Sequence, residues 1–229
     1  MKLAHPDLHF VMEIAETRFP VLILEQSDLY FRLVSELCLQ ADGATGRFVL
    51  SEGLDLLDIG KHTVVVTDFF HLELNGKRQA AALMKRLNAL AVSEHHLQDT
   101  LAVQDQIARW VMELEDELPY AVTHNDPPDT GVILKSAGIR FDDETDGLAE
   151  KICNLIRISA EYLNTRLLIT VGLRTALEED SVRELYKTAM YEKVPVLDIE
   201  RYCPENRLDC EEYYIIDRDN CEIYNDPIV

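Results

Sequence analysis

A long stretch without helix-breaking residues is the feature that most constrains the fold of this chain. Between Gly76 and Leu118 no further glycine and no proline occurs, and alanine, leucine, lysine, glutamine and glutamate dominate. This composition predicts two long helices with a break near residues 95–99. The prolines of the following THNDPPDTG end any helix there. Further helices are predicted over residues 132–137 and 144–163. The middle of the chain is therefore expected to be a helical insertion.

The two flanks of this insertion alternate strands with helices. Apolar or β-branched runs predict strands over residues 21–24, 47–50, 62–68, 167–171, 194–199 and 213–216. One helix is predicted from Ser27 or Asp28, as its N-cap, to a stop at Gly43, and another over residues 178–193. Such alternation is typical of an α/β fold with a mostly parallel sheet.

The chain is expected to divide into an α/β head domain, residues 1–75 and 165–229, and a helical leg domain, residues 76–164. Its 47% of hydrophobic residues suffice for a buried core and exclude intrinsic disorder. The 22 basic and 42 acidic side chains give a net charge of -20, which excludes a uniformly basic nucleic-acid coat. Any DNA contact therefore needs a local positive patch.

Cysteine usage and hydropathy indicate a cytoplasmic protein. The five cysteines are scattered and form no CxxC pair, which fits a reducing compartment. No apolar run resembles a signal peptide or approaches the roughly 20 residues of a membrane span. We therefore expect no membrane association.

The residues after the first apolar strand argue against nucleotide hydrolysis. Their sequence, EQSDLY, has no glycine and no lysine for phosphate, so it lacks the pattern of a phosphate-binding loop. The adjacent His95 and His96 would point about 100° apart on a helix, which does not suit one metal ion. Cys203 and Cys210 are separated by six residues, which is not a zinc-site spacing. None of these groups predicts a catalytic centre.

Three acids near the ends of predicted strands leave an enzymatic alternative open. Asp28, Asp58 and Asp68 lie where α/β proteins place their active sites, so a metal-dependent nuclease that uses these carboxylates is the alternative function. Structural roles are commoner for such acids, because Asp28 suits a helix N-cap and Asp68 ends a strand.

The densest basic group of the sequence lies at the start of the predicted leg. Lys77, Arg78, Lys85 and Arg86 fall within ten residues, and helical spacing places at least three of them on one face. A solvated helix end explains such a group without any function, whereas phosphate contact gives it one. We predict that these four residues bind DNA, with Arg174 as the next candidate.

Acidic residues cluster at the end of the second predicted leg helix. Glu113, Asp116 and Glu117 share one helical face, where like charges repel each other unless a cation intervenes. Asp126 in the following turn adds a fourth carboxylate, and such hard oxygen ligands suit calcium. These four are the predicted calcium ligands, with the acids of residues 142–146 as substitutes. The sequence has no EF-hand loop, and solvated helix charge is the alternative explanation.

Several segments together resemble one family. They are FPVLILEQSDLYFRLVSEL, VVVTDFF, KSAGIRFDDETDGLAEKICNLIRIS, LLITVG, VPVLDIERY and EEYYII. In order and spacing, from Phe19 onward, they are similar to the Csn-type spacer-acquisition protein of type II-A CRISPR systems. None of the segments is catalytic, so the resemblance rests on the hydrophobic strands, the KSAGI turn and the insertion.

The resemblance implies an α/β head related in fold to P-loop NTPases, without a working nucleotide site, and a helical leg. It also implies a homotetrameric ring that threads double-stranded DNA from its ends, binds calcium through acidic leg residues and has no enzymatic activity. The implied partners are the CRISPR integrase complex and the RNA-guided effector nuclease. A ring reconciles DNA binding with the acidic composition, because symmetry repeats a small basic patch fourfold.

Overall fold

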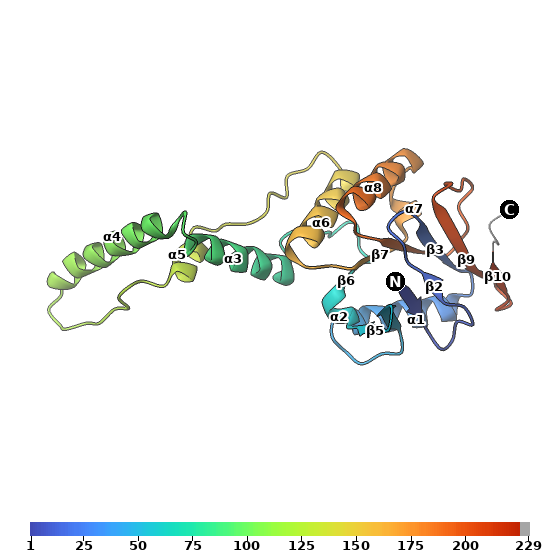
Figure 1. The fold of residues 1–229 in the computed structure, drawn as a ribbon, viewed down its shortest axis with the longest axis horizontal. Helices are drawn as coiled ribbons and strands as arrows, with labels where there is room; N and C mark the ends of the chain where they lie inside the picture. Colours follow the sequence, from blue (N-terminus) through green and yellow to red (C-terminus); the bar gives the residue numbers. More distant parts are fainter. Residues whose placement is uncertain (225–229) are drawn as a thin grey trace. The chain divides into compact units, whose positions relative to one another are not determined.

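The head is built on a six-stranded sheet in the order β10-β9-β3-β8-β7-β6 (Figure 1). Its strands are β3 (Phe19–Leu24), β6 (Thr63–Val66), β7 (Leu167–Val171), β8 (Val196–Glu200), β9 (Glu211–Ile216) and β10 (Glu222–Tyr224). The neighbours are parallel except for the antiparallel pair of β9 and β10. The computed structural model describes residues 1–224, and this sheet confirms the predicted α/β fold.

The central strands are unbroken apolar runs because both faces of the sheet are covered. Every residue of β3 and of β7 is buried. On one face, α1 (Ser27–Ala41) packs Leu29, Leu33 and Leu37 into the core. On the opposite face, α8 (Glu179–Glu192) places the ring of Tyr186 on that of Phe19, with the centroids 3.9 Å apart. The short helices α2 (Ile59–His62) and α7 (Leu173–Ala176) complete the head.

A second, antiparallel sheet of short strands packs on the α1 side of the head. Its order is β2-β1-β4-β5, formed by β1 (Lys2–Ala4), β2 (Met12–Glu13), β4 (Val49–Glu52) and β5 (Asp55–Leu57). Leu3, Met12 and Leu50 of this sheet join the core that holds the apolar face of α1. The sequence predicts only β4 among them, because strands of two or three residues carry too little periodicity to be recognised.

The helical insertion forms a separate unit, Asn75–Asp142. It contains α3 (Lys77–Ala91), α4 (Leu97–Asp116) and α5 (Thr130–Ser136), and α5 packs on α3. The side chain of Asn75 donates to the carbonyl of Phe141 at 2.9 Å and accepts its N–H at 2.8 Å, so the two ends of the unit are tied together. The two long helices and the short third one are as predicted.

Two details of the prediction differ from the structure. The predicted leg includes residues up to 164, whereas α6 (Leu148–Tyr162) lies in the first unit and packs on α8. An apolar helical face predicts burial but does not say which unit buries it. The N-cap of α1 is Gln26, whose side-chain oxygen accepts the N–H of Leu29, rather than Ser27 or Asp28. Among the helices of residues 1–224, none has the length and hydropathy of a membrane span.

Candidate nucleic-acid interface

All four predicted DNA-binding residues lie on α3. Lys77, Arg78, Lys85 and Arg86 are exposed, whereas Leu83 of the same helix is buried. Arg78 and Lys85 are seven residues apart, close to two helical turns, so they point in the same direction. The helix has no acidic residue. Its exposed positions therefore carry these four bases and no acid.

Two of these bases oppose the helix dipole. Lys77 and Arg78 occupy the first turn of α3, which is the positive end of the helix, and the N-cap Gly76 provides no side-chain cap. A cation at this end of a helix is unfavourable, on the order of 0.3–1 kcal/mol at an exposed site. A bound anion would offset that cost. Contact between these bases and phosphate stays a prediction.

The neighbouring helix α4 has the opposite charge. It carries five acids and one base, Arg109, which pairs with Asp105 on the same helix. The insertion thus separates its charges, with cations on α3 and anions on α4. This separation explains how a chain with a net charge of -20 presents a cationic surface.

Among residues 1–224, the structure does not group the four predicted calcium ligands into a metal site. Glu113 and Asp116 lie in the last turn of α4 and Glu117 is its C-cap, and all three are exposed. Among residues 1–224, no three His, Cys, Asp or Glu side chains are close enough to hold one metal ion. Asp126 therefore does not complete a shell with the α4 acids. Helical spacing fixes which carboxylates are neighbours on α4, but it does not fix where the following segment returns.

The acids of the nuclease alternative are bonded to local partners. Asp58 pairs with Lys61 at 3.1 Å and Asp68 with His71 at 2.7 Å. Hydrogen bonds from these partners hold the pKa of each carboxyl below its ordinary value. Asp28 lies exposed in the first turn of α1, where an acid stabilises the helix. In the part of the chain that the structure describes, these three acids do not gather into a metal site.

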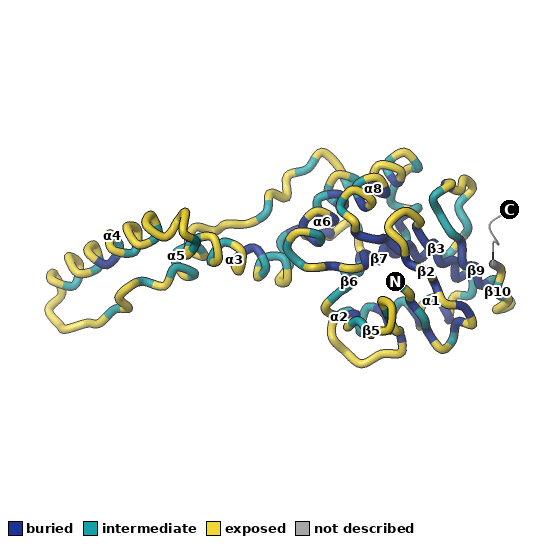
Figure 2. Tube along the Cα trace, viewed as in Figure 1, coloured by how far each residue is buried: buried dark blue, intermediate teal, exposed yellow. Residues whose placement is uncertain are grey.

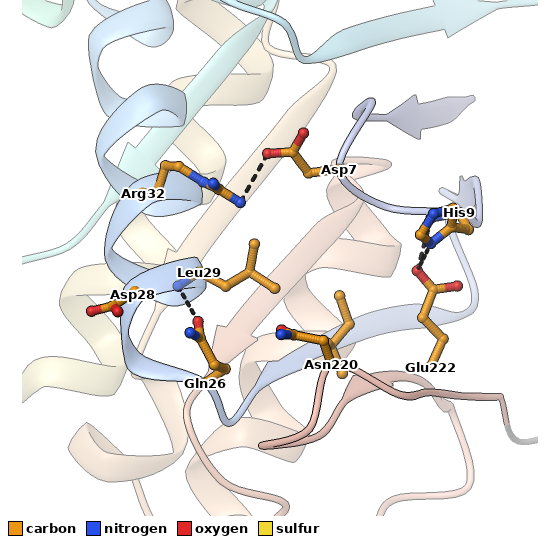
Figure 3. A pocket seen from close by; sticks show the side chains of 9 residues that line it. Asp7, His9, Gln26, Asp28, Leu29, Arg32, Asn220 and Glu222 are labelled. Carbon is orange, nitrogen blue, oxygen red and sulfur yellow. Dashed lines mark hydrogen bonds and ion pairs between the residues drawn. The ribbon is translucent and has the colours of Figure 1, made fainter.

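The turn between β3 and α1, where an α/β head would hold a phosphate, borders a cavity of about 300 Å³ (Figure 3). Asp7, Asp28 and Glu222 line it together with the bases Arg32 and His9. Arg32 pairs with Asp7 and His9 with Glu222, both at 2.9 Å. Each base is thus already matched to a carboxylate. The charge of this cavity opposes a nucleoside triphosphate.

Arg174, the substitute DNA contact, belongs to the interior of the head. Its guanidinium pairs with Glu211, and its side chain is 10% exposed. The prediction for Arg174 is therefore wrong, because a residue directly after a strand can turn inward. Two buried acids of β8, Asp198 and Glu200, are not among the predicted site residues. The sequence feature that could have identified them is the segment VLDIE, which places acids at alternate positions of a strand expected to be apolar.

Solved structures show the fold that this chain shares. The "Crystal structure of Stu0660 of Streptococcus thermophilus" is 10% identical with a TM-score of 0.63, and the match covers 98% of this chain and 76% of that one. That likeness shows the fold. A "Putative ABC transporter (ATP-binding protein)" from Pyrococcus furiosus is 13% identical over 93% of this chain and 97% of that one, and its TM-score of 0.41 carries no conclusion.

Sequence comparison shows the family. No curated protein matches the sequence. The model of the family described as CRISPR-associated protein (Cas_Csn2) matches residues 40–220, which is most of the chain. This match agrees with the resemblance in the strand and turn segments. The protein therefore belongs to the Csn2 family of CRISPR-associated proteins.

Proposed function

We propose that this protein is a non-catalytic DNA-binding protein that holds double-stranded DNA ends during CRISPR spacer acquisition. The observation that carries the proposal is the cationic side of α3 in a member of a CRISPR-associated family. Four bases without an intervening acid suit a row of phosphates, and the rest of this acidic chain offers no comparable group in its sequence. Contacts to the phosphate backbone carry no sequence preference.

A homotetrameric ring would multiply this small basic surface. The second long helix of the insertion, α4, exposes six large apolar side chains, those of Leu97, Leu101, Val103, Trp110, Met112 and Leu114. Exposed apolar surface of this extent marks a contact with another protein surface. We propose that other copies of the chain cover it, and a closed ring then brings the α3 bases of every subunit to one assembly.

The proposed role is that of a clamp in the cytoplasm and not of an enzyme. The acids that a nuclease would use are exposed or bonded to local partners, which supports a binding role. We propose the CRISPR integrase complex and the RNA-guided effector nuclease as partners, because a protein that holds DNA ends serves the step in which those ends are integrated.

Calcium binding by Glu113, Asp116, Glu117 and Asp126 stays a prediction, and no step of the proposed function depends on it. A cation that binds only the folded protein raises the melting temperature. Melting curves in calcium and in chelator test this prediction. Identical midpoints would remove the site.

A comparison of linear and closed-circular DNA of the same sequence tests the function. The protein is incubated with each form in the presence of a divalent metal, and both retention and DNA length are measured. A clamp that loads over ends retains linear DNA at full length and binds circles less. Shortened DNA would support the nuclease alternative, and equal retention of circles would contradict loading over an end.

A further inference from the structure

A buried pair of acids lies on the face of the main sheet that α8 covers. Asp198 of β8 is 0% exposed and Glu200 is 5% exposed. The hydroxyl of Thr170 in β7 donates to Oδ1 of Asp198 at 2.8 Å. Oε1 of Glu200 accepts the backbone N–H of Arg174, in α7, at 2.6 Å. The backbone N–H of Leu173 lies near enough to the carboxyl of Asp198 to lower its pKa, but within residues 1–224 no donor has hydrogen-bond geometry to Oδ2 of Asp198.

The arginine whose backbone N–H binds Glu200 has its own side chain bonded to another acid. The guanidinium of Arg174 pairs with Glu211 of β9, whose side chain is fully buried. Glu211 also accepts the hydroxyls of Tyr186, on α8, at 3.1 Å and of Tyr213, on β9, at 2.6 Å. Three buried acids thus share one arginine. A buried carboxylate without a matching cation or proton is strongly destabilising.

The groups on the α1 side do not supply the missing charge. Tyr30 is the titratable group of α1 that senses the acid pair: the charges of Glu200 and Asp198 help to raise the pKa of its phenol, after burial as the main cause. Arg201 follows Glu200, but its guanidinium donates to the hydroxyl of Ser27 at 2.9 Å and lies over the Tyr30 ring, 5.3 Å from the centroid. Its hydrogen bond therefore goes to the start of α1.

We propose that Asp198 and Glu200 share a proton near neutral pH, which makes the pair a pH-sensitive lock between β8 and the α7 turn. A proton on Asp198 gives this carboxyl a donor, and Glu200 is near enough to accept it. Glu200 keeps its bond to the N–H of Arg174 at the same time. The proton thus satisfies the oxygen of Asp198 that no donor reaches.

The direction of the pKa shifts agrees with this geometry. Burial raises the pKa of the Asp198 carboxyl well above its ordinary value, and the negative charge of Glu200 raises it further. Burial also raises the pKa of Glu200, against the lowering effect of the Arg174 N–H. A group whose pKa is raised in the folded state contributes stability below its unfolded pKa, and that stability is lost as the pH rises through the folded pKa. The lock is therefore expected to weaken as the pH rises.

The variant Asp198→Asn tests the lock, because asparagine has the shape of the protonated acid but does not titrate. Its melting temperature relative to the wild-type protein should rise with pH, from about pH 5 to about pH 9. Across this range, the ratio of the variant's unfolding equilibrium constant to that of the wild type should fall about tenfold for each unit by which folding raises the pKa of Asp198. The matched control Asp55→Asn removes an exposed acid of β5 and should follow the wild-type curve.

Infrared spectroscopy provides a second readout that does not depend on stability. The wild-type protein near neutral pH should show the C=O stretch of a protonated carboxylic acid, and Asp198→Asn should lack it. If Asp198→Asn does not fold, Glu200→Gln replaces it: Asp198 stays buried and protonated, and the frequency of the band should shift because an amide replaces the carboxylate that shares the proton. A wild-type protein without the band, or a melting difference that does not change with pH, would overturn the proposal. Neither result bears on DNA binding.

Discussion

The two units of this chain differ in how far they bury their apolar residues. In the head, every residue of β3, β7 and β8 is buried. Figure 2 shows the tube of α3 and α4 mostly in the colours of exposed and intermediate residues. These two helices bury only Leu83 and Ala108, and Trp110 is 59% exposed. Apolar burial stabilises a unit by about 25 cal/mol per Å², so the head carries its own stability. The insertion exposes the kind of surface that a partner covers.

The largest expected effect is the difference in the free energy of unfolding between two matched leucine truncations, one in each unit. Leu197→Ala removes a fully buried side chain of β8 and should lower the free energy of unfolding by about 2–5 kcal/mol. Leu101→Ala truncates a side chain of α4 that is 48% exposed and should change it by at most about 0.5 kcal/mol. Denaturant unfolding of dilute protein measures both. Equal losses would show that the insertion has a core of its own.

A second prediction concerns self-association of the chain through the exposed apolar residues of α4. Trp110→Ala should weaken self-association by about 2 kcal/mol, because large aromatic residues dominate interface energies, and should leave the head folded. Tyr191→Ala is the control, since Tyr191 is also a strongly exposed aromatic residue but lies on α8 of the head. Light scattering over a concentration series reports the assembly. A purely monomeric wild-type protein, or equal effects of the two variants, would contradict the proposed contact.

A smaller effect is expected from the loss of Glu36, a carboxylate on α1 of the head. Hydrogen bonds from Arg47 lower the pKa of Glu36 to about 2, and burial lowers the pKa of His5 beside it. Both shifts give stability that is present above the unfolded pKa and lost as the pH falls. Glu36→Gln should therefore cost about 1 kcal/mol at neutral pH, a modest value because Arg47 is exposed.

The pH dependence of that difference is its test. Wild-type protein and Glu36→Gln should converge in melting temperature as the pH falls below about 4.5. Glu16→Gln removes an exposed acid of the head and should follow the wild-type curve. If the difference in melting temperature between wild type and Glu36→Gln stays constant from neutral to acid pH, the pKa of Glu36 does not change on folding.

The difference in apolar burial between the two units also explains which of their elements the sequence predicts. The central strands β3 and β7 are predictable because burial on both faces leaves unbroken apolar runs, and α3 and α4 because no glycine or proline interrupts them. The short strands β1, β2, β5 and β10 are missed, because pairing with distant residues and not local pattern makes them strands. The bases of α3 are found on one helix, as predicted from spacing alone. The calcium shell stays a prediction, because it depends on where the segment that carries Asp126 returns, and helical spacing does not determine that path.

A charge reversal on α3 tests the proposed DNA binding most directly. Lys85→Glu with Arg86→Glu is compared with Arg183→Glu with Lys187→Glu, which reverses two exposed bases of α8 and changes the net charge equally. Binding to linear double-stranded DNA is measured over a salt series, with assembly checked by light scattering. We predict that the α3 variant binds every sequence more weakly, with a salt slope that is shallower by about 0.9 for each phosphate that the protein no longer neutralises. The α8 variant should bind like the wild type. Unchanged binding by the α3 variant, or equally weakened binding by both variants, would contradict a DNA interface on α3.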